Sequence, residues 1–344
     1  MRESAARAAL RAMGVLRERD GRSWLELTTS GTSAAPRTVV RSLASWEDSF
    51  EHVSRLTGIT GEDRVLVPAP PSGSMFAFAH AHAAHAGADV VALDRWSVAE
   101  AARALATCTA AHLSPQMLSS LLERDIGSLR TVVCAGAVLP EPVRRRADEA
   151  GLQVVDYYGA AELSFVSMRV GPRLKAFPEV EVDLRDGVVW ARSPWLAEGY
   201  AAGQAGPMLR DADGFATVGD RGRWDAARGL VVEGRGDDAV TTGGVTVLSA
   251  DVEAAVLSLP NVSAVAVVGL PHPDLGEVVE VVVTGSGELD LAALRARAGG
   301  LVDRAHLPRR WHQWDDLPLT AAGKVDRVAV RSRLLAMSRS RERS

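Results

Sequence analysis

Cysteines and long apolar runs are both scarce in this sequence. Cys108 and Cys134 are its only cysteines, and no Cys-x-x-Cys pair occurs. A disulfide framework is therefore excluded as the basis of the fold, and we expect a reducing, cytoplasmic environment. No apolar run reaches the roughly 20 residues of a membrane span. The first twenty residues mix Arg and Glu into an Ala/Leu pattern, so neither a signal peptide nor a membrane anchor is expected.

An excess of positive charge is also missing. The 344 residues include 39 Lys and Arg against 43 Asp and Glu, a formal net charge of −4 at pH 7. Nucleic-acid binding usually needs a basic footprint, so no nucleic-acid partner is expected. Aromatic residues make up only 5% of the chain, which leaves the lining of a ligand pocket unreadable. No Gly-x-Ser-x-Gly elbow and no Gly-x₄-Gly-Lys-Ser/Thr loop occurs, so a serine hydrolase and a P-loop nucleotidase both lack support.

What is present, from residue 64 to residue 157, is a regular alternation of strand and helix patterns. The expected strands are Arg64–Val67, Asp89–Leu93, Thr131–Cys134 and Val154–Tyr157. Helical patterns cover residues 75–85 and 141–149, Ser97 and Ser114 resemble helix N-caps, and Ser45–Asp48 resembles a capping box. This spacing predicts an α/β fold with a largely parallel sheet, flanking helices and a ligand site at the carboxyl ends of the strands.

The pattern changes twice further along the chain. Short strands between Gly and Asp turns predict a small antiparallel β subdomain over about residues 178–233. After Gly234 a second α+β pattern begins. We therefore expect an N-terminal domain over residues 1–234, a mobile C-terminal α+β domain over 235–330, and a flexible, Arg- and Ser-rich tail over 331–344.

A run of hydroxyl side chains follows the first predicted strand. It extends from Leu27 to Arg37, with Thr29, Ser30, Thr32 and Ser33 around Gly31. Many donors, little bulk and one Arg suit a phosphate group. A Ser/Thr-rich surface turn would have the same composition, so this run by itself leaves both interpretations open.

Four later motifs are equally weak when each is taken alone. Tyr158 to Glu162 combines an aromatic ring, a Gly and a carboxylate at a strand end. Asp220 lies in a Gly-Asp turn, and the stretch from Gly234 through Gly244 is rich in Gly and Asp. Lys324 follows a Gly near the C-terminus. Individually these are most simply a core Tyr, an Asp turn, a loop and a solvated Lys.

Taken together in this order and spacing, the five motifs resemble the adenylate-forming superfamily. This superfamily comprises the acyl-CoA synthetases, firefly luciferases and peptide-synthetase adenylation domains. The resemblance extends from about residue 24 to residue 328. It implies an ATP or AMP site whose matching residues are Thr29, Ser30, Gly31, Thr32, Ser33, Gly136, Tyr158, Gly159, Asp220 and Arg235.

The resemblance also implies individual roles. Tyr158 matches the aromatic residue that stacks on adenine, and Asp220, assisted by Arg235, matches the acid that binds the ribose hydroxyls. Glu162 matches the carboxylate that holds Mg²⁺. Lys324 matches the lysine that bridges the substrate carboxylate and the α-phosphate during adenylation.

Two further implied features concern the second half of the reaction. Asp237 matches the hinge about which the small C-terminal domain rotates, and Gly243 and Gly244 match the glycines of the pantetheine tunnel. The resemblance thus implies an ATP-dependent acid–CoA ligase in fatty or aryl acid metabolism, with a small carboxylic acid, ATP and CoA as substrates and Mg²⁺ as cofactor. One active site then needs two domain orientations.

The sequence departs from the family pattern around the ATP. Family loops usually read Thr-Ser-Gly-Thr-Thr-Gly-x-Pro-Lys-Gly, whereas here Ala34, Arg37 and Thr38 replace a Gly, the Lys and the last Gly. Arg37, at the position that contacts the outer phosphates, is the third candidate catalytic residue beside Glu162 and Lys324. Ala161 replaces the usual Thr or Ser. Since only 28 residues precede Thr29, we expect a short form that lacks the first N-terminal subdomain.

These departures keep other functions open. The chain could load the phosphopantetheine of an acyl carrier protein instead of CoA. It could also catalyse only the thioester step, or be a silent binding homologue, although a silent protein has no need for Lys324. The sequence identifies neither the substrate acid nor the oligomeric state. A metal site at His80, His82 and His85 is disfavoured, because ligand number and helical geometry both fail.

Overall fold

The computed structural model describes residues 3–29, 37–71, 73–235, 239–242, 245–304, 306–320 and 323–341. The chain divides into two compact units. The first comprises Met1–Val232 and Ala321–Lys324, and the second comprises Glu233–Thr320 and Val325–Ser344. The division falls two residues before the boundary expected after residue 234, and it assigns a late, four-residue segment to the first unit.

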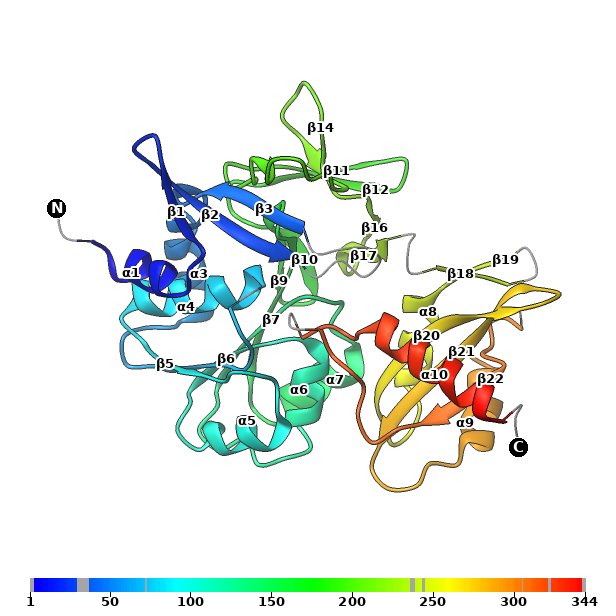
Figure 1. Cartoon of the computed structure of the whole chain (residues 1–344). Helices are drawn as coiled ribbons and strands as arrows, with labels where there is room; N and C mark the ends of the chain where they lie inside the picture. Colours follow the sequence, from blue (N-terminus) through cyan, green and yellow to red (C-terminus); the bar gives the residue numbers. More distant parts are fainter. Residues whose placement is uncertain are drawn as a thin grey trace. The chain divides into compact units, whose positions relative to one another are not determined.

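The first unit contains seven helices among its described residues and most of the strands (Figure 1). The helices are α1 (Ala5–Ala12), α2 (Ala44–Glu47), α3 (Phe50–Thr57), α4 (Ser74–Ala86), α5 (Val98–Leu105), α6 (Pro115–Leu121) and α7 (Glu141–Glu149). The strands are β1 (Leu16–Arg19), β2 (Arg22–Thr29), β3 (Arg37–Ser42), β4 (Arg64–Val67), β5 (Asp89–Ala92), β6 (Ala110–Leu113), β7 (Thr131–Cys134), β8 (Gln153–Ala160), β9 (Ser164–Val170), β10 (Arg173–Ala176), β11 (Glu181–Arg185), β12 (Val188–Arg192), β13 (Gly199–Tyr200), β14 (Leu209–Arg210), β15 (Ala216–Thr217), β16 (Asp220–Asp225) and β17 (Gly229–Arg235), the last of which crosses the division.

A parallel block of strands in the order β8-β7-β6-β4-β5 forms the centre of the main sheet. Helices α1, α3 and α4 lie on one side of it and α5, α6 and α7 on the other (Figure 1). The Ser97 and Ser114 side chains accept hydrogen bonds from the first turns of α5 and α6, as their N-cap pattern predicts. The predicted α/β class is therefore confirmed, and the carboxyl ends of β6, β7 and β8 share one edge.

One detail of the prediction is refined and another is wrong. Strands β11, β12, β14, β15 and β16 are paired antiparallel, as predicted for residues 178–233, but they continue the main sheet, whereas β13 joins a separate antiparallel sheet, β1-β2-β3-β13. Ser45 is not an N-cap, because its hydroxyl donates to the Ser42 carbonyl at 2.6 Å and accepts from Arg41 at 2.9 Å. The expected helix is accordingly interrupted between α2 and α3.

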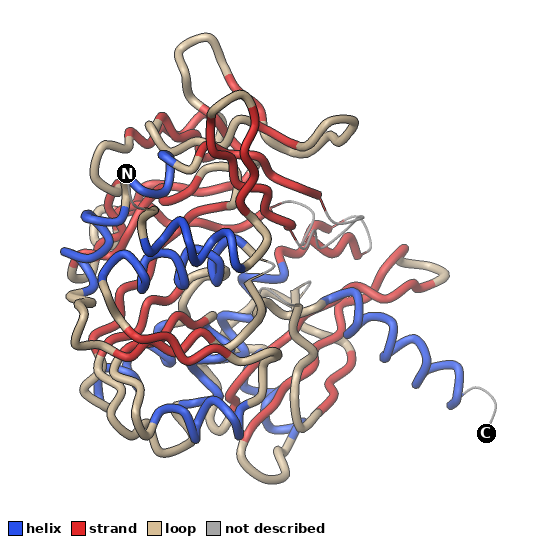
Figure 2. The backbone as a smooth tube through the Cα atoms, turned by 60° about the vertical axis from the view of Figure 1, so that its left-hand side comes forward, coloured by secondary structure: helices blue, strands red, loops and turns tan. Residues whose placement is uncertain are grey.

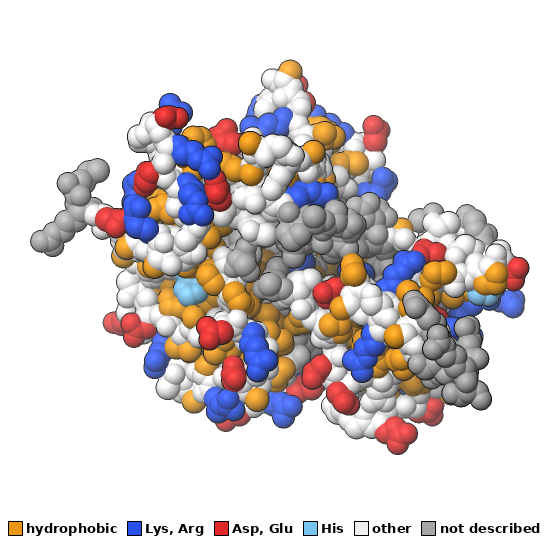
Figure 3. Space-filling view, viewed as in Figure 1, with side chains coloured by type: hydrophobic (Ala, Val, Ile, Leu, Met, Phe, Trp, Pro, Cys, Tyr) orange, Lys and Arg blue, Asp and Glu red, His pale blue; other side chains and the backbone are white. Residues whose placement is uncertain are grey.

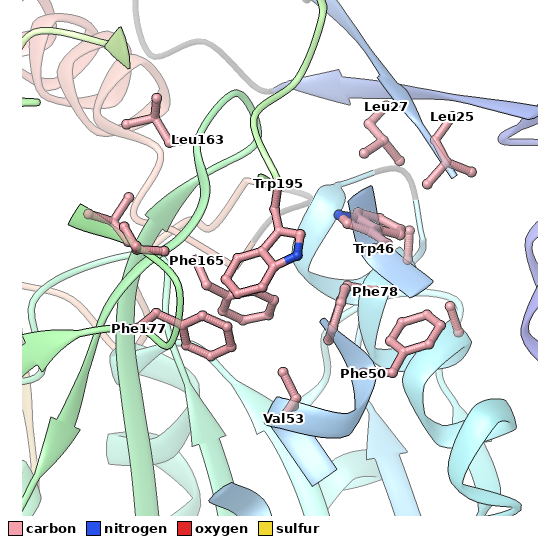
Figure 4. Close-up of a cluster of buried hydrophobic side chains, with 14 of the residues drawn as sticks. Leu25, Leu27, Trp46, Phe50, Val53, Phe78, Leu163, Phe165, Phe177 and Trp195 are labelled. Carbon is pink, nitrogen blue, oxygen red and sulfur yellow. The ribbon is translucent and has the colours of Figure 1, made fainter. Parts of the chain in front are cut away.

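Several of the aromatic residues form one buried cluster (Figure 4). Trp46 lies 5.3 Å from Phe78 between ring centroids, Phe78 lies 4.9 Å from Phe165, and Phe177 lies 4.9 Å from Phe165 and 5.0 Å from Trp195. Such edge and offset contacts add about 0.5–1.5 kcal/mol per pair to the effect of burial. The cluster fixes α2 and α4 against β9 and the segment that carries Trp195.

The second unit is a mixed sheet packed against helices. Its elements are β18 (Ala239–Thr242), β19 (Val245–Leu248), α8 (Ser249–Leu257), β20 (Val262–His272), β21 (Gly276–Gly285), α9 (Leu291–Ala298), β22 (Arg310–Gln313) and α10 (Arg327–Arg341). The strand order is β19-β18-β21-β20, with β22 parallel to β21. The α+β pattern expected for this part of the sequence is present.

The tail expected to be flexible from residue 331 onward is helical through Arg341, which corrects that prediction. Figure 2 shows α10 as one continuous helix. Val330 and Leu334, four residues apart, are 0% and 1% exposed and pack on β20. The many Arg and Ser residues concealed this i, i+4 apolar pair in the sequence.

The surface mixes both signs of charge. Figure 3 shows basic and acidic side chains interspersed over the face in view, in agreement with the small net charge. Among the helices that the structure describes, none is long and apolar enough to cross a membrane.

Candidate active site

A tight hairpin between β8 and β9 positions two of the predicted site residues. A Cβ atom at Gly159 would lie 2.1 Å from the carbonyl oxygen of Ser164, so only glycine fits there. The hairpin places Tyr158 before this turn and Glu162 within it. The close backbone approach explains why a glycine follows the tyrosine in the motif.

Tyr158 and Asp220 lie in direct contact. The Tyr158 hydroxyl donates a hydrogen bond of 2.8 Å to Oδ2 of Asp220. Asp220 begins β16 and is 7% exposed, and Tyr158 is half-buried. Two residues 62 positions apart in the sequence, predicted to contact adenine and ribose, are thus brought together. Their roles remain predictions.

Glu162 is a buried carboxylate held by residues far along the chain. It is 5% exposed, and its Oε1 accepts a 2.9 Å hydrogen bond from the Tyr200 hydroxyl. Its carbonyl accepts a 2.8 Å hydrogen bond from the backbone N–H of Ala197. The sequence reasoning missed Tyr200. The available signal was weak: Tyr200 is the only tyrosine of the three outside the Tyr157–Tyr158 pair.

The surroundings of Glu162 fit a Mg²⁺ ion of the kind that the resemblance implies. Mg²⁺ prefers hard oxygen ligands, and beside nucleotides it uses one or two carboxylates together with phosphate and water oxygens. No group of three His, Cys, Asp or Glu residues suited to hold a metal by itself occurs in the described part of the chain. Within the described part of the site, Glu162 is the carboxylate that can serve as a ligand to such an ion.

Lys324 lies beside Gly136 within the first unit. Gly136 follows β7 with a φ of +94°, and a Cβ atom there would lie 3.4 Å from Cε and 3.7 Å from Cγ of Lys324. At Gly323, a Cβ atom would lie 2.7 Å from Cε of Met117. Both glycines therefore allow the lysine segment to approach the strand ends closely. Two more predicted site residues are thereby brought together.

Only the two ends of the predicted phosphate loop belong to the described residues. Thr29 ends β2 and Arg37 begins β3, and the two are paired across these antiparallel strands. The intervening Ser30, Gly31, Thr32 and Ser33 lie outside the described residues, as do Asp237, Gly243 and Gly244. Arg235 ends β17, and its side chain, like that of Thr29, is also not described.

Comparison with known proteins places this geometry in a family. Residues 27–201 match the AMP-binding enzyme family, and residues 251–324 match the AMP-binding enzyme C-terminal domain. The chain belongs to the AMP-binding enzyme family. The first of these matches by itself spans just over half of the chain, and the two together include the Glu162 hairpin and Lys324.

Two sequence relatives and one solved structure illustrate the likeness of this AMP-binding enzyme. It is 27% identical to the uncharacterized acyl–CoA ligase YhfT of Bacillus subtilis, over 88% of this chain and 67% of that protein. It is 30% identical to a probable 2-succinylbenzoate–CoA ligase of Mycobacterium tuberculosis, over 89% of this chain and 83% of the other. The structure of a variant of E. coli MenE with bound OSB-AMS is 25% identical with a TM-score of 0.76, over 90% of this chain and 68% of that one. The predicted class, an AMP-forming acid–CoA ligase, is confirmed at this general level.

Proposed function

We propose that this AMP-binding enzyme converts a small carboxylic acid, ATP and CoA into an acyl thioester through an acyl-adenylate. The observation that carries the proposal is that one unit contains five predicted site residues in three features. These are the Tyr158–Asp220 pair, the held Glu162 carboxylate, and Lys324 packed beside Gly136. The family and the acyl–CoA ligase relatives support the same reaction.

In the first half-reaction a carboxylate oxygen attacks the α-phosphorus of ATP and pyrophosphate leaves. Two anions must be brought together, so the site has to supply positive charge and hydrogen-bond donors. Tyr158 and Asp220 orient the nucleoside, and the strand ends at Thr29 and Arg37 hold the triphosphate. Lys324 offers its ammonium group to the attacking carboxylate and the α-phosphate.

Glu162 holds Mg²⁺ in this scheme. When bound, the ion neutralises phosphate charge that would otherwise repel the incoming carboxylate. The protein's contribution is to keep the Glu162 carboxylate oriented, which the Tyr200 hydroxyl does by donating to Oε1. The other lone pairs of the carboxylate oxygens stay available to a cation.

Tyr200→Phe is expected to lower the rate of pyrophosphate release about tenfold and to raise the Mg²⁺ concentration needed for half-maximal rate. Loss of a hydrogen-bond partner behind a metal ligand typically costs 10–100-fold. The Met208 backbone N–H, which donates to the same hydroxyl at 3.2 Å, also loses its acceptor. Steady-state pyrophosphate release over a Mg²⁺ titration measures the effect, and an unchanged half-saturation point would contradict it.

In the second half-reaction a thiol attacks the acyl-adenylate and AMP leaves. A cavity of about 320 Å³ in the second unit favours CoA over a carrier protein as the thiol donor. It is lined by Arg295, Arg304 and Arg309 above aliphatic side chains, and by Thr242, the residue before Gly243. None of these three guanidinium groups has an acidic partner among the described residues. Three unpaired arginines suit the several phosphates of CoA better than the single phosphate of a carrier-bound arm.

Arg295→Ala combined with Arg304→Ala is therefore expected to raise the KM for CoA at least about tenfold, because charge-assisted hydrogen bonds are worth roughly 1.5–3 kcal/mol each. The KM for pantetheine, which lacks the nucleotide, should stay unchanged. Thioester formation from a supplied acyl-adenylate is the measurement. Arg297→Ala, on the same helix but outside the cavity lining, is the matched control. Equal losses for both thiols would refute the assignment.

The overall proposal is tested by pyrophosphate release from ATP with a panel of fatty acids, aryl acids and 2-succinylbenzoate, each with and without CoA. Release that depends on one class of acid, with an acyl-CoA product when CoA is present, is expected. A protein that consumes synthetic acyl-adenylate and CoA but releases no pyrophosphate would be a thioester-forming enzyme only. A protein inactive in both assays would be a binding homologue.

A further inference from the structure

Arg41 is a buried cation that the proposed reaction does not yet use. It lies in β3, four residues after Arg37, and is 1% exposed. Its Nε donates to the Ser45 hydroxyl at 2.9 Å, its Nη1 donates to the Ala161 carbonyl at 3.0 Å, and its Nη2 donates to the Trp195 carbonyl. A fully buried guanidinium is costly unless such acceptors surround it.

Two of these acceptors belong to chain segments that are joined to the main chain of Glu162. Ala161 precedes Glu162 in the sequence, and Trp195 begins the segment whose Ala197 N–H donates to the Glu162 carbonyl. Burial lowers the pKa of Arg41 to about 9, while the neighbouring Glu162 carboxylate raises it, so the guanidinium is charged at neutral pH. The cation therefore fixes both chain segments that frame the Glu162 backbone.

Strand β3 adds a second connection to the same carboxylate. It pairs with β13, with Val39 opposite Tyr200, and the backbone N–H of Glu198 donates to the Val40 carbonyl at 2.8 Å. Tyr200 in turn donates to Glu162. One short strand thus carries the end of the phosphate loop at Arg37 and two independent links to Glu162.

We propose that Arg41 is a positioning residue that holds the Glu162 turn in register with Arg37 through β3. It touches neither nucleotide nor acid. It acts by fixing the main chain on both sides of the carboxylate, so that Glu162 meets the cation of a Mg²⁺·ATP complex without reorganisation. The inference rests on the proposed function, because it assumes that this site binds ATP with a divalent cation.

Binding, measured without turnover, gives the decisive test. Calorimetry yields the affinity of the whole protein for ATP with Mg²⁺ and with EDTA, and the ratio of the two is the gain due to the metal. Arg41→Met should lower this gain about tenfold or more, the usual cost of removing a residue behind a metal ligand. Affinity for metal-free ATP should change by less than about threefold. Arg41→Lys keeps the charge but not the planar fork, so its metal-dependent gain should lie between those of the wild type and Arg41→Met.

A double-mutant cycle separates positioning from general stability. Glu162→Gln should itself remove most of the metal-dependent gain. If Arg41 acts through Glu162, then Arg41→Met added to Glu162→Gln lowers the gain no further. If both substitutions lower the metal-dependent gain independently, or if Arg41→Met leaves that gain unchanged, the inference is overturned. If Arg41→Met does not fold, the same comparison with Arg41→Lys decides between these outcomes.

Arg130→Met is the matched control. Arg130 pairs with the buried Asp63 at 2.5 Å, near the starts of β4 and β7 and so at the opposite ends of the parallel strands from the site. The Arg130→Met variant should be less stable than the wild type but keep the wild-type metal-dependent gain in ATP affinity. Failure of the proposed function has a different signature, because then the wild-type protein shows no metal-dependent ATP binding. That result overturns both proposals, whereas a wild-type gain that Arg41→Met retains overturns this one alone.

Discussion

Lys324→Ala should lower pyrophosphate release by about 10²–10³, the usual cost of removing one positioned donor to a developing charge. In the proposed reaction, Lys324 offsets a repulsion that exists only while the acid approaches the α-phosphate. Thioester formation from a supplied acyl-adenylate should therefore remain close to the wild-type rate. Two rates per variant, from ATP plus acid and from acyl-adenylate plus CoA, make the measurement. The variant that lacks both Arg295 and Arg304 should show the reverse pattern.

The composition of the chain offers an unusually clean control for this variant. Lys175 and Lys324 are the only two lysines in the sequence. Lys175 is exposed on β10, and its replacement by Ala should leave both rates unchanged. If Lys324→Ala retains the wild-type rate of pyrophosphate release, Lys324 has been misassigned. If it lowers both rates equally, the residue supports the fold and not one step.

Acid should destabilise the first unit steeply, because two buried histidines must stay neutral. His82 and His112 are 0% and 1% exposed, and burial lowers their pKa values to about 4 and about 3. The ring nitrogens of His112 have no hydrogen-bond partner among the described residues, and His82 has only a 2.9 Å contact with Ser54. Their environment therefore offers little to stabilise a proton.

The sign of the effect follows from linkage. The unfolded chain binds protons at a pKa near 6.5, whereas the folded chain does so only near 3–4. The stabilisation is complete above pH 6.5 and is lost as the pH falls from there toward 4, by up to about 1.4 kcal/mol per pH unit for each histidine. Urea unfolding at several pH values measures this slope. His112→Gln should reduce it by about half.

A core variant provides the comparison for the acid effect. Phe165→Leu removes ring contacts with Phe78 and Phe177 in the aromatic cluster and should lower stability by a similar amount at every pH, leaving the slope unchanged. If His112→Gln also leaves the slope unchanged, a different group is responsible for the acid sensitivity.

Local patterns predicted the elements of this fold well, and long-range pairing accounts for what they missed. β7 and α7 have the bounds that periodicity indicated, since buried runs and Pro near a helix start are local signals. Ser45 looked like a cap because the sequence does not show that Arg41, four positions earlier, is buried and needs it as an acceptor. Strand patterns in residues 178–233 likewise do not specify which sheet those strands join.

The candidate site divides in the same way. Residues within a motif, such as Tyr158 and Glu162, could be chosen from the sequence, and the structure brings Tyr158 to Asp220. The residues that hold Glu162 could not be predicted, because Tyr200 is 38 positions away and Arg41 contacts a carbonyl 120 positions away. Only the folded chain makes such neighbours visible.

The apolar pair on α10 also sets a lower limit on how far the protein can be shortened. A truncation after residue 330, where the composition turns to Arg and Ser, would remove Leu334 from its place against Leu270 and the other apolar residues of β20. That face would then be exposed to water as a contiguous apolar patch. Such patches favour self-association, so the shortened protein would be lost to aggregation during expression.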